Sequence, residues 1–445
     1  MRIRTRPEPQ STMPSGPLRK NLNRVASRLG RLRFELILGL VLRGASAVTG
    51  FALVWLIVQV FGAEVVGLYQ LGIVTMTLSS VLACQGLDRI LVRDASVAIH
   101  EGNLAEGKAK FLTACTRILC VGIPLTVLIV VFADPLANRL LREPAAAVHL
   151  RILAPALVTT AIIRVSASLL RARGDVMLSQ SLDGWTYSGI AAIVVGSIWL
   201  SGMTADARLP AAAYLGGTTI VMTAGLIVVV RMTRGWTVDR KAALSVAPGL
   251  RIAGFNALAQ FNTWIGLALL TASAGAASAG IFRVGFQFCL LFTLINSSFA
   301  MMIGPHIARA AAVRDAGGVK GTLRTATLLG CGICLPLLLG LMVFAEDAMR
   351  LFGPDFIRGA NALRVLAAGQ FLNVAFGPVG AALTMMKSEK AVLRIEVVAT
   401  AAGVLLTIVL IPPYGMLGAA IGATSAIILR NTLSFATLRF RLRRI

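Results

Sequence analysis

The stretch ELILGLVLRGASAVTGFALVWLIVQVFG, from Glu35 to Gly62, decides the fold class. Its apolar run is longer than the roughly 20 residues with which an α-helix crosses a membrane. It nevertheless contains Arg43, although a charge at the centre of a membrane helix costs about 2.5–3.5 kcal/mol. The stretch therefore predicts a membrane-spanning helix whose arginine either serves a function inside the protein or reaches back to the membrane surface.

The composition of the whole chain extends this interpretation. Of its 445 residues, 57% are hydrophobic and only 14% are charged, whereas a soluble domain averages about 25% charged residues. The mean hydropathy is +0.80 and the formal net charge is +24. In a membrane protein, such a charge marks cytoplasmic loops and contacts with anionic lipid head groups. The few aromatic residues do not alternate with the basic clusters, so no nucleic-acid partner is expected. We expect an all-α polytopic membrane protein.

Apolar runs of similar length recur along the chain and predict about twelve spans. The spans are 36–61, 67–86, 111–132, 148–170, 177–200, 211–230, 249–271, 280–303, 322–344, 360–384, 391–411 and 414–436. The predicted organisation is a basic tail (1–35), a six-helix bundle (36–231), a linker (232–248), a second six-helix bundle (249–436) and a basic tail (437–445).

Lys and Arg are unevenly distributed between the two sets of loops. The N-terminal tail, alternate loops such as RARGD and KGTLRTA, and the final RFRLRRI are rich in them, whereas the opposite loops contain far fewer. Positively charged loops stay in the cytoplasm. Both termini are therefore expected there, which requires an even number of spans.

The six cysteines lie inside apolar runs, and two of them, Cys331 and Cys334, have CxxC spacing. No histidine or second CxxC accompanies this pair, so packing inside a helix is favoured over metal or redox chemistry. We expect neither a metal site nor a cofactor.

The chain matches itself at an offset of 212 to 214 residues. Four pairs of segments carry the match: GLYQLG (67–72) with GIFRVG (280–285), LRILA (150–154) with LRVLA (363–367), IPLTVLIVVFAD (123–134) with LPLLLGLMVFAE (335–346), and RGD (173–175) with KSE (387–389). Each half of the duplication holds six predicted spans, so the two halves have the same orientation in the membrane. This plan is typical of transporters, which bind substrate between the halves near the membrane midplane.

The stretch FGAEVVGLYQLGIVTMTLSSVLACQGLDRILVRDAS (61–96) resembles lipid-linked oligosaccharide flippases of the multidrug/oligosaccharidyl-lipid/polysaccharide exporter superfamily. The later stretches FADPLANRLL, LLRARGD, AGIFRVG, LFGPDF and LIPPYGMLGAAIGATSAI resemble that family in order and spacing. The resemblance implies a bacterial inner-membrane protein with two six-helix bundles around a central cavity. It implies transport of polyprenyl-pyrophosphate-linked sugar units to the outer leaflet. Many relatives carry an acid near the end of the seventh span, whereas NTWIGLALL (262–270) is uncharged, which weakens the transfer of an ion-coupling site to that place.

Polar residues inside the spans are the candidates for substrate binding. The repeat places Arg43 over Asn256 and Gln70 over Arg283. Gln260 lies on the same helical face as Asn256, one turn further along. Polar groups inside a membrane face a cavity or another helix. Arginine forms bidentate pairs with phosphate oxygens, so Arg43 and Arg283 are expected to bind the pyrophosphate.

Three further residues join the predicted substrate site, and for two of them the sequence leaves another role open. Gln287, one turn from Arg283, together with Asn256, Gln260 and Gln70, would suit sugar hydroxyls. Arg164 and Arg117 also join the predicted substrate site, although each lies near enough to the cytoplasmic end for snorkelling or helix pairing. The same alternative applies to Arg43.

Asp183 is the deepest acid and the candidate site for a coupling ion, H⁺ or Na⁺. A structural role at a helix end is its alternative. The expected partners are a lipid-linked oligosaccharide, membrane lipids, and polysaccharide polymerase and export machinery.

Three functions compete. The first is the flippase, which is a transporter and not an enzyme. The second is a cation-coupled multidrug exporter of the same superfamily, which would need an acidic cavity where this chain has arginines. The third is a membrane enzyme of polysaccharide assembly, which is disfavoured because the outer loops are short. No GxxxxGK[ST] motif is present, so ATP hydrolysis is not expected to drive transport.

Overall fold

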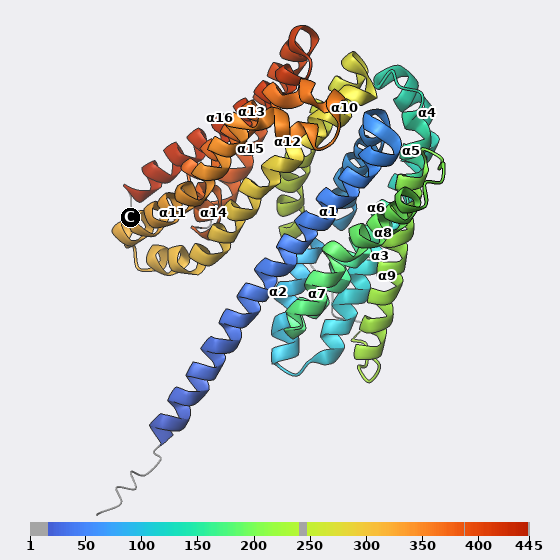
Figure 1. Cartoon of the computed structure of the whole chain (residues 1–445). Helices are drawn as coiled ribbons and strands as arrows, with labels where there is room; N and C mark the ends of the chain where they lie inside the picture. The colour runs from blue at the N-terminus through green and yellow to red at the C-terminus, as the bar shows by residue number, and fades with distance from the viewer. Residues whose placement is uncertain (1–16, 240–246, 387, 444–445) are drawn as a thin grey trace, which may run out of the picture.

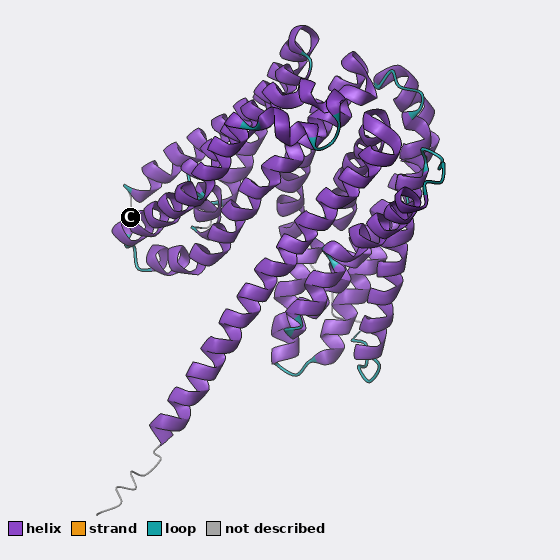
Figure 2. Ribbon diagram, viewed as in Figure 1, coloured by secondary structure: helices purple, strands orange, loops and turns teal. Residues whose placement is uncertain are grey.

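The computed structural model describes residues 17–239, 247–386 and 388–443. Within these ranges every regular element is a helix and there is no strand (Figure 2). Together with the apolar runs described below, this confirms the prediction of an all-α polytopic membrane protein.

The elements fall into two groups, which we call the N half (α1 to α9) and the C half (α10 to α16). The N half contains α1 (Pro17–Cys84), α2 (Leu87–His100), α3 (Leu104–Val131), α4 (Ala133–Pro135), η1 (Leu136–Leu140), α5 (Ala146–Leu153), α6 (Ala156–Arg173), α7 (Val176–Leu182), α8 (Trp185–Ser201) and α9 (Leu209–Met232). The C half contains α10 (Ala247–Ala312), α11 (Ala316–Val343), α12 (Ala345–Arg350), η2 (Pro354–Gly359), α13 (Ala360–Ala375), α14 (Val379–Met385), α15 (Glu389–Tyr414) and α16 (Met416–Leu442). In Figure 1 the C half lies to the left and the N half to the right. Helix α1 of the N half packs against α10 of the C half where the two groups meet.

Membrane-crossing helices account for most of the described chain. Nine helices there are long and apolar enough to cross a membrane, and the pair α7 and α8, bent by 43°, makes a tenth. Two of the nine, in α1 and α10, each join two helical segments at a glycine. Counting these segments separately is compatible with the twelve expected spans, and the number itself stays a prediction.

The two glycines that interrupt α1 and α10 lie at equivalent positions of the repeat. Gly62 has φ 79° and ψ −174°, and Gly275, 213 residues later, has φ 80° and ψ 166°. Only glycine adopts such a positive φ readily, because it has no Cβ. The same backbone break therefore occurs once in each half. In the N half it directly follows the first predicted span, 36–61, and in the C half it follows the predicted span 249–271.

Helices α3 and α11 also correspond in detail. Both have 28 residues and contain an internal proline, Pro124 or Pro336. Both begin with a side-chain cap: Asn103 accepts from the backbone N–H of Glu106, and Asp315 accepts from that of Gly318. Such caps satisfy N–H groups that the first helical turn leaves without partners. The local signals of the repeat thus produce the same local structure twice.

Several predicted boundaries differ from the structure. The predicted span 148–170 is divided between α5 and α6, 177–200 between α7 and α8, and 360–384 between α13 and α14. Two of these divisions coincide with prolines, Pro155 and Pro378, which lack the N–H of a continuing helix. In addition, α1 begins at Pro17 and α16 reaches Leu442, so helices extend into both segments predicted as tails.

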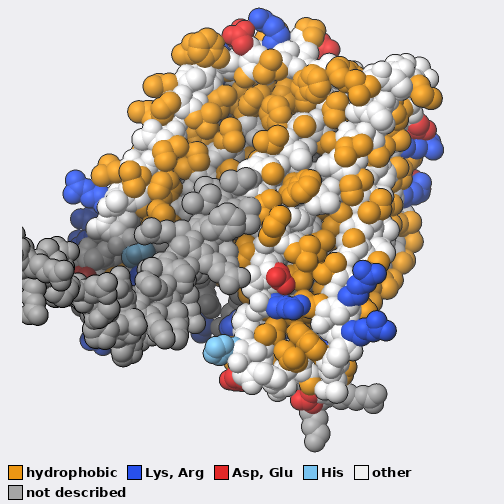
Figure 3. Space-filling view, turned by 60° about the horizontal axis from the view of Figure 1, so that its bottom comes forward, with side chains coloured by type: hydrophobic (Ala, Val, Ile, Leu, Met, Phe, Trp, Pro, Cys, Tyr) orange, Lys and Arg blue, Asp and Glu red, His pale blue; other side chains and the backbone are white. Residues whose placement is uncertain are grey.

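The outside of the molecule is apolar between its two ends. Figure 3 shows hydrophobic side chains over the flanks and charged side chains gathered towards the ends. Exposed apolar residues of the membrane-crossing helices include Ile193, Leu339 and Val409. A surface of this kind is suited to the hydrocarbon of a bilayer. The largest buried cluster contains residues of both halves, among them Leu71 of α1 and Phe292 of α10, so the halves share one core.

Candidate functional site

The two halves meet most closely at a pair of glycines on α1 and α10. A Cβ on Gly67 would overlap the carbonyl oxygen of Ala276, and a Cβ on Gly280 would overlap that of Ala63. Both pairs of corresponding residues, Gly67 with Gly280 and Ala63 with Ala276, are 213 residues apart. The contact is therefore reciprocal, as between two copies of one unit. We call these four residues the glycine seam.

Arg283 lies one turn beyond the seam and joins the halves through a neutral partner. Its Nε donates to Oε1 of Gln70 at 3.2 Å, and its Cζ lies 5.0 Å from the centroid of the Phe286 ring. Gln70 is buried and Arg283 is partly buried. Among the described side chains no carboxylate forms an ion pair with Arg283. The structure thus brings together two predicted substrate-binding residues and leaves the arginine's charge without an acid to balance it.

The other predicted residues of this region lie on the same two helices. Asn256 and Gln260 are half-buried and one turn apart on α10, before the break at Gly275. Gln287 lies beside α1, with its Nε2 3.6 Å from the Cβ position of Gly50. Arg43 belongs to α1, but its side chain lies outside the described residues. Its predicted contact with pyrophosphate stays a prediction.

Two tryptophans link the halves and were not identified from the sequence. Trp264 of α10 donates from Nε1 to Oγ1 of Thr75 at 2.9 Å. Trp55 of α1 donates from Nε1 to the carbonyl oxygen of Leu351 at 3.0 Å. Buried indole N–H groups usually have an acceptor, but the chain alone does not show which one. The Trp264 bond joins α10 to α1, whereas the Trp55 bond joins α1 to Leu351, directly after α12.

A second polar site lies inside the N half, and we call it the N-half pocket. It has a volume of about 210 Å³ and contains Arg164 of α6 and Asp183, which follows α7. Oδ2 of Asp183 accepts from Nη2 of Arg171 at 2.9 Å. The remaining lining residues are Met76, Thr77, Thr160, Ile163, Tyr187 and Tyr214. The structure therefore places the predicted coupling acid beside the predicted Arg164 and beside Arg171, for which the sequence predicted no role.

The N-half pocket depends on the bend between α7 and α8. Asp183 and Gly184 separate the two helices, and a Cβ on Gly184 would lie 2.6 Å from the carbonyl oxygen of Gln180. The rings of Tyr187 and Tyr214 meet edge to face, 5.7 Å between centroids. The glycine thus permits the bend that turns Asp183 towards α6.

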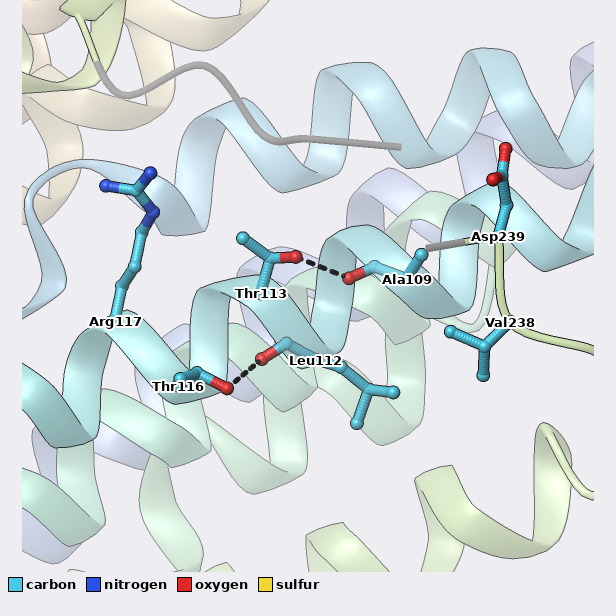
Figure 4. Close-up of a pocket in the computed structure, with 7 residues that line it drawn as sticks. All are labelled: Ala109, Leu112, Thr113, Thr116, Arg117, Val238 and Asp239. Atoms are coloured by element: carbon cyan, nitrogen blue, oxygen red, sulfur yellow. Dashed lines mark hydrogen bonds between the residues drawn. The ribbon is translucent and has the colours of Figure 1, made fainter. Parts of the chain in front are cut away.

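Arg117 lies elsewhere, on the surface of α3. It is exposed and lines a pocket of about 490 Å³ together with Val238 and Asp239. Figure 4 shows Arg117 and Asp239 at opposite ends of this pocket, with Thr113 and Thr116 bonded back to their own helix. The structure does not bring Arg117 together with Arg283 or with Asp183.

The described residues contain no group of three or more His, Cys, Asp or Glu that could hold a metal ion. Their chemistry is that of guanidinium, amide and hydroxyl groups. Such groups bind anions and sugars by hydrogen bonds and charge.

Comparison with known proteins agrees with this architecture. The model of a family described as "Polysaccharide biosynthesis protein" matches residues 56–356. Among curated proteins, the chain is similar to "Probable low-salt glycan biosynthesis flippase Agl15" of Haloferax volcanii, with 19% identity over 188 residues. The similar segment covers 41% of this chain and 40% of that relative, less than half the length of either.

Two solved structures show the fold. An inward-facing multidrug resistance transporter of the MATE family, in the MOP superfamily, superposes with a TM-score of 0.75 at 16% identity, covering 92% of this chain and 98% of the other. The lipid II flippase MurJ in an inward closed conformation superposes with a TM-score of 0.73 at 15% identity, covering 91% and 87%.

Proposed function

Because the chain belongs to the family of polysaccharide biosynthesis proteins, we propose that it flips polyprenyl-pyrophosphate-linked oligosaccharide units across the bacterial inner membrane by alternating access. The units supply the synthesis of a surface polysaccharide such as exopolysaccharide, capsule or O-antigen. In this proposal the protein is a transporter and not an enzyme, and both termini lie in the cytoplasm. A relative named as a glycan biosynthesis flippase and the fold shared with a lipid II flippase support the proposal.

The observation that carries the proposal is Arg283 at the boundary of the halves. A guanidinium inside a membrane protein is costly and normally has a partner. Here its hydrogen-bonded partner is the neutral amide of Gln70, so the positive charge remains available to an anion. The pyrophosphate of a lipid-linked sugar is such an anion, and it accepts bidentate bonds from arginine. Gln70, Gln287, Asn256 and Gln260 offer amides for the sugar hydroxyls.

The test is complementation of a deletion strain, read as surface polysaccharide and as accumulated lipid-linked intermediate. We expect Arg283→Ala to reduce export strongly at normal protein abundance. The loss of one charge-assisted contact is worth about 1.5–3 kcal/mol, or roughly a tenfold to hundredfold weaker engagement of the substrate. Arg283→Lys should retain part of the activity, because it keeps the charge but not the planar fork. Arg43→Ala should resemble Arg283→Ala if both bind the pyrophosphate.

The matched control is Arg309→Ala, since Arg309 is an exposed arginine of the same helix that bonds only to the carbonyl oxygen of Pro305 among the described groups. Export at the wild-type level by Arg283→Ala, with equal protein abundance, would contradict the proposal.

The coupling ion of this proposal acts at Asp183 in the N-half pocket. The Arg171 guanidinium already lies 2.9 Å from the carboxylate. Na⁺ would have to displace that guanidinium, whereas a proton adds almost no volume. Of the two candidate ions, this geometry favours H⁺.

A cation-coupled multidrug exporter is the second candidate, and the MATE fold favours it. A cavity for cationic drugs requires unpaired acids. Among the described residues, Asp183 and Glu396 are acids inside the two halves, and each faces an arginine instead. Unchanged drug sensitivity of the deletion strain, together with loss of polysaccharide, would separate the two functions. Polymerase and export machinery are the proposed partners of the flippase, and a membrane enzyme of polysaccharide assembly is the least supported function.

A further inference from the structure

A groove with a basic mouth and an apolar interior lies at one end of the C half. It has a volume of about 490 Å³ and is formed by α11, the junction of α13 and α14, and α16. These elements converge near the C-terminus in Figure 1. By the distribution of basic residues this end faces the cytoplasm. The groove thus lies at the level of the inner-leaflet head groups.

Two helices line the groove with the same order of side chains. Along α11, Lys320 and Arg324 are followed one turn deeper by Leu328. At the end of α16, Arg439 and Arg443, which directly follows the helix, are succeeded one turn deeper by Phe435. Residues four apart lie on one helical face, so each helix presents two cations at the surface and an apolar residue below. The ring of Phe435 contacts that of Phe376, 6.4 Å between centroids, at the apolar end.

The four cations are exposed, and no described carboxylate forms an ion pair with any of them. Like charges four residues apart on a helix repel each other. The repulsion between these cations therefore destabilises the protein, and a bound anion would relieve it.

The corresponding part of the N half lacks this arrangement. Lys108, at the position of Lys320 in the repeat, donates to the carbonyl oxygens of Thr233 and Trp236 at 3.1 and 3.0 Å. Leu112 takes the place of Arg324. A general excess of positive charge at cytoplasmic ends would affect both halves, so the groove of the C half is a specific feature.

We propose that this groove binds an anionic glycerophospholipid of the inner leaflet, with its phosphate between the α11 and α16 arginines and an acyl chain along Leu328, Phe376 and Phe435. Guanidinium groups bind phosphate oxygens directly, and clustered basic residues at a membrane surface attract anionic lipids. The apolar interior accounts for the choice of a lipid over a soluble phosphate. This proposal does not depend on the transported substrate.

The test measures lipid retained by the purified full-length protein in detergent, by native mass spectrometry, with phosphatidylglycerol and phosphatidylethanolamine as probes. We expect preferential retention of phosphatidylglycerol by the wild type. At about 1 kcal/mol for each arginine, the double variant Arg324→Ala/Arg439→Ala should retain the lipid roughly thirtyfold less well. The control double variant Arg89→Ala/Arg309→Ala removes the same charge from exposed cytoplasmic-end positions outside the groove and should retain the lipid. Phe435→Ala should weaken retention without changing the charge.

Three results would overturn the proposal. Equal losses in the groove variant and the control variant would indicate a diffuse effect of charge. Equal retention of both lipids would remove the requirement for an anion. Displacement of phosphatidylglycerol by millimolar inorganic phosphate, with no effect of Phe435→Ala, would indicate a simple anion site. Gel filtration of each variant excludes misfolding, and the single variant Arg439→Glu provides a second, independent loss of charge complementarity.

Discussion

Asp183 of the N half and Glu396 of the C half are 213 residues apart and thus hold the same position of the repeat, yet their surroundings differ. Asp183 lies at the break between α7 and α8, beside a pocket of about 210 Å³, and is 2.9 Å from Nη2 of Arg171. Glu396 lies within the unbroken α15, with its side chain 5% exposed and Oε1 3.9 Å from Nη1 of Arg430. Its Oε2 is buried without a hydrogen-bond partner among the described groups.

The neighbours of Arg430 complete the contrast. Its Nη2 donates to Oδ1 of Asn373 at 3.5 Å, and Nδ2 of Asn431 donates to the same oxygen at 2.7 Å. The acid of the C half is therefore buried beside an arginine that is itself held by an amide, whereas the acid of the N half faces a pocket. A group that exchanges an ion needs space and a path, so the difference favours the N half as the place of coupling.

The largest effect of a substitution is expected at the glycine seam, where the two halves have identical residues. Gly67→Val and Gly280→Val each force a side chain against a backbone carbonyl that cannot rotate away. Overpacking typically costs about 1–3 kcal/mol and more when the backbone must move. We expect both variants to lose export and to unfold at lower temperature, measured by a thermal melt in detergent. Gly266→Ala is the control on α10, since open space surrounds that glycine. Normal behaviour of either valine variant would contradict reciprocal packing.

A smaller effect is expected from exchanging the residues that follow the two acids. Gly184→Val introduces the valine that the C half has at the equivalent position, Val397. The Cβ of this new side chain would lie 2.6 Å from Oγ of Ser46 and 2.6 Å from the carbonyl oxygen of Gln180. Val397→Gly makes the reverse change at an exposed position of a continuous helix. We expect Gly184→Val to lower both stability and export, and Val397→Gly to cost no more than about 1 kcal/mol. Equal effects in thermal melts would show that the bend has no special role.

The last and smallest difference expected between the halves is that between the two acids themselves. Asp183→Asn removes a charge-assisted bond to Arg171 and should cost about 1–3 kcal/mol. It should also abolish the dependence of transport on a pH gradient in proteoliposomes. Glu396→Gln removes a charge 3.9 Å from Arg430, but that arginine is 31% exposed and keeps its bond to Asn373, so the effect should stay at or below about 1 kcal/mol. Loss of coupling in Glu396→Gln but not in Asp183→Asn would reverse the comparison.

The sequence by itself determined the membrane class, the helical content and the equivalent positions of the repeat. Hydropathy over about 20 residues is a local property, because each span must satisfy its own backbone in hydrocarbon. The offset that pairs Gly62 with Gly275 and Pro124 with Pro336 also needs no knowledge of packing. For the same reason, the breaks at Gly184 and Pro378 were missed: apolar composition continues across them although the helix does not.

Only the tertiary structure decided which polar groups meet. The rotation of each helix about its axis and the packing between halves bring Gln70 to Arg283 across 213 residues and Arg171 to Asp183 across the bend. Those same rotations leave Arg117 on the surface of α3, although its distance from the membrane edge in sequence resembles that of Arg164. Sequence gives the depth of a residue in the membrane, because depth follows from position along a helix. The direction in which the side chain points depends on neighbouring helices, which are far away along the chain.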